Sequence, residues 1–262
     1  MASKYYVVWR GRETGIFTDW ATCKKQIDKF AGAKYKSFKT LAEAESAFKG
    51  SSVSSSVGTK GGSAPQATRR KANTASRTIK TYSAQEVEQL KAETKIFTDG
   101  GCEPNPGEAG SGVAVYRDGK IDSLWYGLYN PKGTNNTAEL NALHQALLMA
   151  ENEVDAKRTV AIFCDSKYSI QCITQWAAGW QKKGWKKPGG EIKNLELIKE
   201  IFSLYQTLKE NIKVLHVNGH VGVEGNELAD RMSILAMESK EEAFVRYTGN
   251  IDVPAILALR AG

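Results

Sequence analysis

Residues 95–101, Lys-Ile-Phe-Thr-Asp-Gly-Gly, decide the fold of most of this chain. Their apolar side chains predict a buried strand, and the two glycines after Asp99 predict that the strand ends at this acid. A second apolar stretch, Val160–Cys164, is also followed directly by an aspartate, Asp165. Ligands of open α/β sheets bind at such carboxyl ends of strands. The sequence therefore predicts two acids at one edge of a sheet.

The elements on either side of this stretch predict a mixed sheet. Three successive strands are expected first, and helices and strands then alternate. The expected strands cover residues 95–99, 111–116, 121–129, 159–164 and 213–217, and the expected helices cover 137–153, 166–176, 195–208 and 224–237. This order indicates an α/β domain with helices on the faces of a mixed sheet.

Two further acids are predicted to point inward from helices. Glu139 begins an apolar stripe, because apolar residues follow it three, four and seven positions later. Asp230 is in line with apolar residues four and seven positions later on the helix over 224–237. Residues at these spacings share one helical face, so both carboxylates should be directed at the sheet rather than at bulk water.

Four inward-directed acids in one domain favour a metal site. Burying neighbouring carboxylates is costly unless a cation neutralises them. Hard oxygen ligands suit Mg²⁺ or Mn²⁺. Two such ions about 3.5–4 Å apart can activate a water and stabilise the leaving oxygen of a phosphodiester. A cap, a turn or a solvated face would explain any single acid, but four together favour the metal site.

The chain is predicted to have four parts. Residues 1–49 have the pattern of a small α/β domain, with strands over 5–10, 16–17 and 35–38 and helices over 21–30 and 41–48. Residues 50–82 begin with a stretch rich in Ser, Gly, Val and Thr, which is typical of a flexible linker. Residues 83–239 form the main domain, opened by a capping box of Ser83 and Glu86. Residues 240–262 form a C-terminal extension of unknown role, with a helix near 255–259.

The positive charge is concentrated in the first third of the chain. The net charge is +7. Residues 1–50 contain ten basic and five acidic residues, and residues 51–80 contain six basic and no acidic residues. The remainder contains 20 basic and 24 acidic residues. This asymmetry favours a nucleic-acid partner for the N-terminal region.

The sequence predicts no membrane span. No apolar run approaches the roughly 20 residues that cross a bilayer, and the apolar run at the N-terminus is too short for a signal-peptide core. The four cysteines form neither a CxxC pair nor a disulfide-like pattern, which favours a reducing compartment. We therefore expect a cytoplasmic, monomeric protein.

Five motifs resemble those of the type I ribonuclease H family. They are Thr98–Gly101 (TDGG), Thr134–Leu140 (TNNTAEL), Cys164–Tyr168 (CDSKY), Gly219–Gly222 (GHVG) and Gly225–Asp230 (GNELAD). The resemblance covers roughly residues 94–237 and implies a ribonuclease H-like, five-stranded mixed sheet flanked by helices. It also implies an endonuclease that hydrolyses the RNA strand of RNA–DNA hybrids and leaves 5′-phosphate and 3′-hydroxyl ends.

The same resemblance implies roles for individual residues. Asp99 would bridge two Mg²⁺ ions, with Mn²⁺ as a substitute. Asp230 would bind the ion on the nucleophile side, and Glu139 and Asp165 the ion on the leaving-group side. His220, in a glycine-flanked loop, would assist proton transfer or product release.

The resemblance further implies three sets of substrate contacts. Asn105, Asn135 and Asn136 would contact RNA 2′-hydroxyls, which distinguish RNA from DNA. Lys132, Thr134 and Asn194 would form a site for a DNA phosphate. A basic protrusion would grip the DNA strand through aromatic planes interleaved with lysines; its residues are Trp176, Trp180, Lys182, Lys183, Trp185, Lys186 and Lys187.

The first 48 residues resemble the hybrid-binding, viroplasmin-like domain that precedes many such enzymes. Tyr6, Trp20 and Tyr35 would contact the DNA strand, and Lys36 a phosphate. Ser37 stands where the family often has a second lysine. The implied partner is an RNA–DNA hybrid, with double-stranded RNA as an alternative ligand of this domain.

Three other functions share part of this pattern. A transposase, integrase or Holliday-junction nuclease would share the acidic cluster, but His220, the TNN segment and the Trp/Lys protrusion favour the ribonuclease. A catalytically silent binding module is disfavoured because all four acids are present. A viroplasmin-type interaction domain would leave the downstream motifs without a role.

Overall fold

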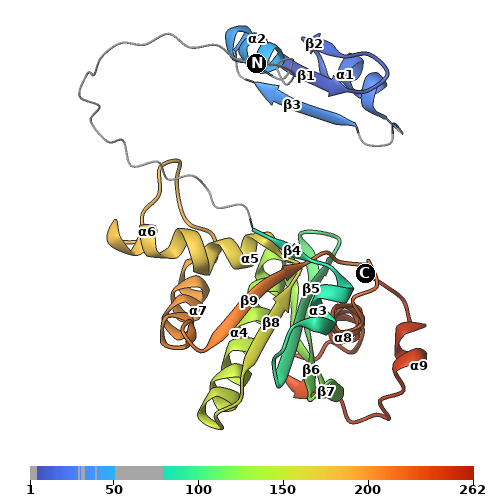
Figure 1. The fold of residues 1–262 in the computed structure, drawn as a ribbon, viewed down its shortest axis with the longest axis vertical. Helices are drawn as coiled ribbons and strands as arrows, with labels where there is room; N and C mark the ends of the chain where they lie inside the picture. The colour runs from blue at the N-terminus through green and yellow to red at the C-terminus, as the bar shows by residue number, and fades with distance from the viewer. Residues whose placement is uncertain (1–4, 29, 31–32, 39, 51–78) are drawn as a thin grey trace, which may run out of the picture. The chain divides into compact units, whose positions relative to one another are not determined.

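The computed structural model describes residues 5–28, 30, 33–38, 40–50 and 79–262. The chain divides into an N-terminal unit, Met1–Ala72, and a C-terminal unit, Asn73–Gly262 (Figure 1). Residues 51–78, nearly all of the predicted linker, lie outside the described residues. The four cysteines are free thiols. Among the described helices, none is long and apolar enough to cross a membrane.

The N-terminal unit is a three-stranded antiparallel sheet in the order β2-β1-β3 with two helices. Its elements are β1 (Tyr5–Arg10), β2 (Gly15–Phe17), α1 (Trp20–Ile27), β3 (Lys34–Phe38) and α2 (Leu41–Gly50). Helix α1 begins where Asp19 accepts a hydrogen bond of 2.8 Å from the Thr22 amide. This arrangement follows the predicted order of elements.

The C-terminal unit is built on a seven-stranded mixed sheet in the order β10-β7-β6-β5-β8-β9-β4. The strands are β4 (Thr81–Tyr82), β5 (Thr94–Glu103), β6 (Gly107–Arg117), β7 (Lys120–Gly133), β8 (Val160–Cys164), β9 (Ile212–Val217) and β10 (Val245–Arg246). Strands β5, β6 and β7 are antiparallel neighbours, whereas β8 and β9 run parallel to β5.

Helices cover both faces of this sheet (Figure 1). The helices are α3 (Ala84–Gln89), α4 (Asn135–Asp155), α5 (Lys167–Gln171), a π-helical turn (Cys172–Trp176), α6 (Ala177–Lys182), α7 (Leu195–Leu208), α8 (Glu224–Ser239) and α9 (Val253–Leu257). Alternate residues of β5 enter two separate cores, since strand side chains point to opposite faces. Ile96 packs with α4 and α7, and Phe97 packs with α8.

The predicted fold class is confirmed, and the sheet has two more strands than the five expected. The additional strands, β4 and β10, are two residues long and pair at the edges with β9 and β7. Elements this short have no periodic pattern in the sequence. Thr81 and Tyr82, which were predicted to belong to the linker, lie in the sheet. The helix expected over 166–176 is also longer and is interrupted by the π-helical turn.

Candidate active site

Asp99 and Asp165 lie side by side at one edge of the parallel part of the sheet. The pairing between β5 and β8 ends at Thr98 and Cys164, so the next residue of each strand is one of the two acids. On its other side β5 continues to Glu103, because its antiparallel pairing with β6 persists. The prediction that the strand ends at Asp99 is therefore wrong, since only the pairing with β8 ends there.

Glu139 reaches the same place from helix α4. Thr134 caps the start of this helix, because its hydroxyl accepts a hydrogen bond of 3.2 Å from the Thr137 amide. Gly100 allows the helix to approach the strand, because a Cβ atom there would lie 2.2 Å from the Glu139 amide nitrogen. A side chain at position 100 would therefore push Glu139 away from Asp99.

Asp230 comes from helix α8 on the opposite face. Gly112 of β6 permits the close packing of this helix, since a Cβ atom there would lie 2.1 Å from the Ala229 carbonyl oxygen. Ser233, one turn after Asp230, has its hydroxyl 3.5 Å from the Asp99 carboxylate. The two acids from helices and the two from strands thus converge on one site.

All four acids line a single cavity of about 460 Å³. His220 also lines it from an exposed loop, in the left-handed region with φ of 54°. The remaining lining residues are Gly100, Gly101, Cys102, Glu103, Asn135, Ile234, Met237, Arg260, Ala261 and Gly262. The predicted catalytic residues, which are spread over more than 130 positions of sequence, meet in this cavity.

Three of the acids in the cavity, Asp99, Glu139 and Asp165, have raised pKa values. Burial raises the pKa of Asp99 well above its ordinary value, and the charges of Asp165 and Asp230 raise it further. Burial, followed by the charges of Asp99 and Asp165, likewise raises the pKa of Glu139. Burial also raises the pKa of Asp165, although nearby His220 opposes this shift. A cation in the cavity would relieve this repulsion.

Two carboxylate oxygens in the cavity are free to bind a metal ion. Glu139 Oε2 and Asp165 Oδ1 are buried and have no hydrogen-bond partner within the described part of the chain. One ligand atom each of Glu139, Cys164 and Asp165 lies within 4.8 Å of the other two. Buried polar atoms normally have partners, so two orphaned carboxylate oxygens side by side fit a divalent cation.

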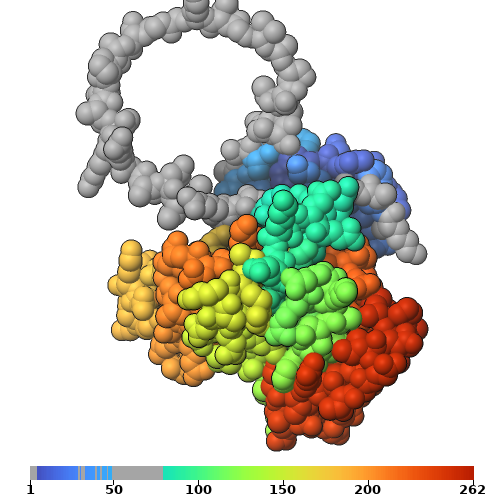
Figure 2. Space-filling view, turned by 60° about the horizontal axis from the view of Figure 1, so that its bottom comes forward, coloured from blue at the N-terminus to red at the C-terminus, as the bar shows by residue number. Residues whose placement is uncertain are grey.

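Asp230 differs from the other three acids because an arginine forms an ion pair with it. The Arg231 guanidinium forms an ion pair with it, and the Gly262 amide lies 3.2 Å from each of its two carboxylate oxygens. Arg231 also donates to the carbonyls of Leu257 and Leu259. The C-terminal segment, residues 240–262, is red in Figure 2. It therefore extends from β10, which pairs with β7 at the edge of the sheet, to the cavity, which its last three residues line.

Sequence reasoning missed these contacts of the C-terminal segment, along with Ser233. The serine lies three positions after Asp230 and could have been found by the same helical spacing. The contacts of Arg231 with residues 257–262 depend on the path of the chain after α8, for which the sequence has no signal.

The residues predicted to contact RNA lie next to the cavity. Asn105 accepts a hydrogen bond of 3.3 Å from the Asn135 amide, which joins the β5–β6 turn to the start of α4. Asn136 is exposed beside them. Among the predicted phosphate ligands, Thr134 and Asn194 both contact the Thr137 hydroxyl, at 2.8 and 3.0 Å, and Lys132 is exposed. Sequence reasoning did not single out Thr137, which links the two.

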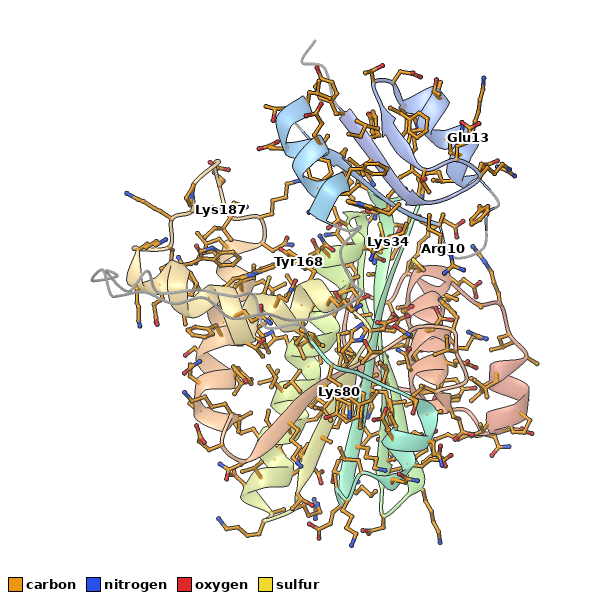
Figure 3. The ribbon with its side chains drawn as sticks, turned by 45° about the horizontal axis from the view of Figure 1, so that its top comes forward. Arg10, Glu13, Lys34, Lys80, Tyr168 and Lys187 are labelled. Atoms are coloured by element: carbon orange, nitrogen blue, oxygen red, sulfur yellow. The ribbon has the colours of Figure 1, made fainter. Side chains whose placement is uncertain are left out.

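The predicted basic protrusion follows α5 and includes α6. Trp176 and Trp180 are half-buried, contact each other with ring centroids 5.8 Å apart, and pack against the core beside α7. Lys182, Lys183 and Lys186 are exposed, and Lys187 is half-buried in the loop after α6 (Figure 3). The tryptophans thus support a projecting segment whose lysines face solvent.

The N-terminal unit contains an exposed aromatic cluster. The Trp20 ring centroid lies 5.4 Å from that of Tyr6 and 5.9 Å from that of Tyr35. Trp20 and Tyr35 are 44% and 46% exposed, unusually high for large aromatic side chains. The Lys36 ammonium lies 5.7 Å from the centre of the Phe38 ring. The three aromatic residues predicted to bind DNA therefore form one surface.

Family models match both units of the chain. A model described as RNase H matches residues 91–238. A second model, described as the ribonuclease H1 N-terminal domain, matches residues 4–48. Between them, the matches include the four acids, His220 and the aromatic cluster.

Individual relatives agree with these matches. Ribonuclease H1 of Mus musculus is 31% identical over 265 residues, which cover 91% of this chain and 90% of the mouse protein. Ribonuclease H of Chromohalobacter salexigens is 40% identical over 149 residues, which cover 56% of this chain and 86% of that protein. A foamy viral protease-reverse transcriptase, solved in complex with RNA/DNA hybrid, shares the fold, with a TM-score of 0.50 and 19% identity over 67% of this chain and 23% of the viral one. The chain therefore belongs to the ribonuclease H family of enzymes and has a ribonuclease H1 N-terminal domain ahead of its catalytic unit.

Proposed function

We propose that the protein hydrolyses the RNA strand of RNA–DNA hybrids with two bound Mg²⁺ ions, leaving 5′-phosphate and 3′-hydroxyl ends. The observation that carries this proposal is the pair of buried, unpartnered oxygens of Glu139 and Asp165 next to Asp99 and Asp230. Buried oxygens of acids that serve only the structure would have hydrogen-bond partners, as buried polar atoms normally do.

The four acids would hold the ions, with Asp99 shared between the two sites. When bound, the ions lower the pKa of the attacking water and stabilise the charge on the leaving oxygen. Glu139 and Asp165 enter the cavity from α4 and β8, so both can bind the ion on the leaving-group side. Asp230 would hold the ion on the nucleophile side. Mn²⁺ suits the same oxygen ligands and is expected to substitute.

His220 is suited to proton transfer at the cavity. Its loop is exposed and glycine-flanked, and histidine is the side chain that enzymes use most often for proton transfer. The position of the ring at the rim of the cavity supports a role in protonating the leaving 3′-oxygen or in releasing the product. It is not among the ion ligands.

The substrate is selected by contacts to both strands. Asn105, Asn135 and Asn136 lie beside the acids, where they contact the 2′-hydroxyls next to the cut. The Thr134–Asn194 site and the lysines of the protrusion bind the DNA phosphates. A hybrid supplies both features at once, whereas double-stranded DNA lacks the 2′-hydroxyls.

The N-terminal unit adds affinity through its aromatic cluster. Trp20 and Tyr35 offer exposed rings to the DNA strand beside the half-buried Tyr6, and Lys36 offers a charge to its phosphates. Double-stranded RNA is the alternative ligand of this unit. The protein is expected to act as a monomer.

The test is cleavage of a labelled RNA–DNA duplex in Mg²⁺, beside single-stranded RNA and double-stranded DNA. We expect cleavage of the RNA strand of the hybrid only. Asp99→Asn should bind the hybrid without cutting it, and Asp118→Asn, at an exposed turn of the same unit, should behave as wild type. Cleavage by Asp99→Asn at the wild-type rate would refute the proposal.

A further inference from the structure

His216 of strand β9 is a buried histidine next to the active site with both ring nitrogens in use. It is 2% exposed. Its Nδ1 lies 2.8 Å from the Thr81 hydroxyl, and its Nε2 lies 3.1 Å from the main-chain carbonyl oxygen of Asp165. The ring therefore connects the edge strand β4 to the backbone of a predicted metal ligand.

The partners of the ring fix the direction of its hydrogen bonds. A carbonyl oxygen can only accept, so Nε2 has the proton and donates to Asp165. In the neutral imidazole, which burial favours, Nδ1 then has a free lone pair. The Thr81 hydroxyl donates to Nδ1. Thr81 thus holds His216 in the tautomer and orientation that Asp165 requires.

Thr81 is itself held in place by its short strand. It pairs with His216 in the parallel register of β4 and β9, at the edge of the sheet (Figure 1). Lys80, labelled in Figure 3, forms an ion pair of 2.8 Å with Glu86 and lies 4.2 Å from the centre of the Tyr82 ring. These contacts fix the segment directly before helix α3.

The direction of the Asp165 side chain depends on how its main chain is held. It follows β8 at the point where the pairing of this strand with β9 ends, at Cys164 and His216. The side chain is not fixed on its Oδ1 side, because that oxygen has no partner among the described residues. The hydrogen bond from the His216 side chain to the Asp165 carbonyl holds the main chain just beyond the end of this pairing and so restricts the direction of the carboxylate.

We propose that Thr81 and His216 are positioning residues that orient the Asp165 carboxylate for its cation, an inference that rests on the proposed function. The edge strand β4 thereby becomes part of the catalytic apparatus. Loss of the Thr81 hydroxyl weakens the binding of the cation and lowers kcat. It leaves the contacts with the hybrid unchanged, because neither residue lies among the predicted substrate contacts.

The test compares Thr81→Val with Thr81→Ser in the full-length protein. Valine preserves the shape and removes the donor, whereas serine restores it. We expect Thr81→Val to lower kcat and to raise the half-saturating Mg²⁺ concentration by about 10-fold, the lower end of what outer partners of metal ligands contribute. The KM for the hybrid should stay unchanged, and Thr81→Ser should behave as wild type.

A matched control separates positioning from general stability. Thr159→Val removes a threonine hydroxyl that contacts Glu93 at the opposite end of the sheet. It should change the melting temperature without changing the Mg²⁺ dependence. His216→Phe should reproduce the Thr81→Val effect, and the double variant should be no worse than His216→Phe, because the two residues act through one path.

Calorimetric titration of the full-length variants with Mg²⁺ separates this inference from the proposed function. If Thr81→Val cleaves the hybrid and binds Mg²⁺ as wild type does, the positioning role is refuted and the proposed function stands. A wild type that binds Mg²⁺ but cuts no hybrid refutes the proposed function, while weaker Mg²⁺ binding by Thr81→Val still supports the positioning role. A wild type that does neither refutes both.

Discussion

Helix α4 contains two buried glutamates, one at each end, with opposite electrostatic surroundings. Glu139 is 5% exposed and Glu153 is 4% exposed. At Glu153, burial acts to raise the pKa, but hydrogen bonds from Arg158, Arg117 and Thr94 outweigh it and lower the pKa to about 2. At Glu139, burial and the neighbouring acids both raise the pKa, and Oε2 has no partner.

The same contrast runs along strand β5. Thr94, near the start of the strand, donates a hydrogen bond of 2.7 Å to Glu153, whereas Asp99, five residues later, faces Glu139. Burial is equal at the two ends, so burial alone does not mark a functional acid. What distinguishes the active-site end is that buried carboxylates meet there while an oxygen of Glu139 and an oxygen of Asp165 have no hydrogen-bond partner in the described part of the chain.

The largest expected effect is on catalysis at the Glu139 end. Glu139→Gln should lower kcat by about 1,000-fold or more, because a metal ion supplies several kcal/mol of transition-state stabilisation and each 1.4 kcal/mol is tenfold. The melting temperature of the metal-free variant should equal or exceed that of wild type, since a repelled charge is removed. Initial rates on a labelled hybrid and a thermal melt measure both.

The matched change at the other end should have the opposite result. Glu153→Gln should leave kcat unchanged and lower the free energy of unfolding by about 2–3 kcal/mol, less than for a fully buried pair because both arginines are partly exposed. For a unit of this size that is about 5–10 °C in melting temperature. If Glu153→Gln is as stable as wild type, the hydrogen bonds and ion pairs of Glu153 do not stabilise the fold, and the contrast with Glu139 is wrong.

The acids at the two ends of α4 should also change the stability of the protein in opposite directions as pH rises. The folded-state pKa of Glu153 is about 2, below its ordinary 4.5, so its stabilisation is complete above about pH 4.5 and is lost as pH falls toward 2. Asp99 and Glu139 have raised pKa values. They bind more protons in the folded state, so the stability of the metal-free protein falls as pH rises above their ordinary values of 3.8 and 4.5.

Urea unfolding of the metal-free protein between pH 3 and 8 measures these slopes. Glu139→Gln should reduce the loss of stability at higher pH, and Glu153→Gln should reduce the loss at lower pH. Identical pH profiles for wild type and Glu139→Gln would show that Glu139 is not under electrostatic strain.

The smallest effect is expected at the exposed aromatic cluster of the N-terminal unit. Trp20→Ala should raise the KM for a long hybrid about fivefold, the lower end of the 1–3 kcal/mol that stacking of one base supplies. It should change neither kcat nor the melting temperature of the catalytic unit. Trp20→Tyr preserves a ring face and serves as the control, and a KM unchanged in Trp20→Ala would remove this residue from the binding surface.

The sequence predicted the elements with long periodic patterns and the acids attached to them. The apolar runs before Asp99 and Asp165 and the helical stripes beginning at Glu139 and Asp230 were sufficient to place all four, because strand ends and helix faces follow from local pattern. The two-residue strands β4 and β10 were missed, since their pairing depends on distant partners. The contacts of His216 and Arg231 were missed for the same reason.

The most direct test of the central claim is the effect of Mg²⁺ on thermal stability at pH 8. If the unpartnered acids hold the ion, saturating Mg²⁺ should raise the melting temperature of wild type, corresponding to about 2.7 kcal/mol at 100 times the Kd. Glu139→Gln should show a much smaller rise, and Glu153→Gln should show the full rise from a lower starting point. A wild type that Mg²⁺ leaves unchanged, or a Glu139→Gln variant that gains as much as wild type, would contradict the claim.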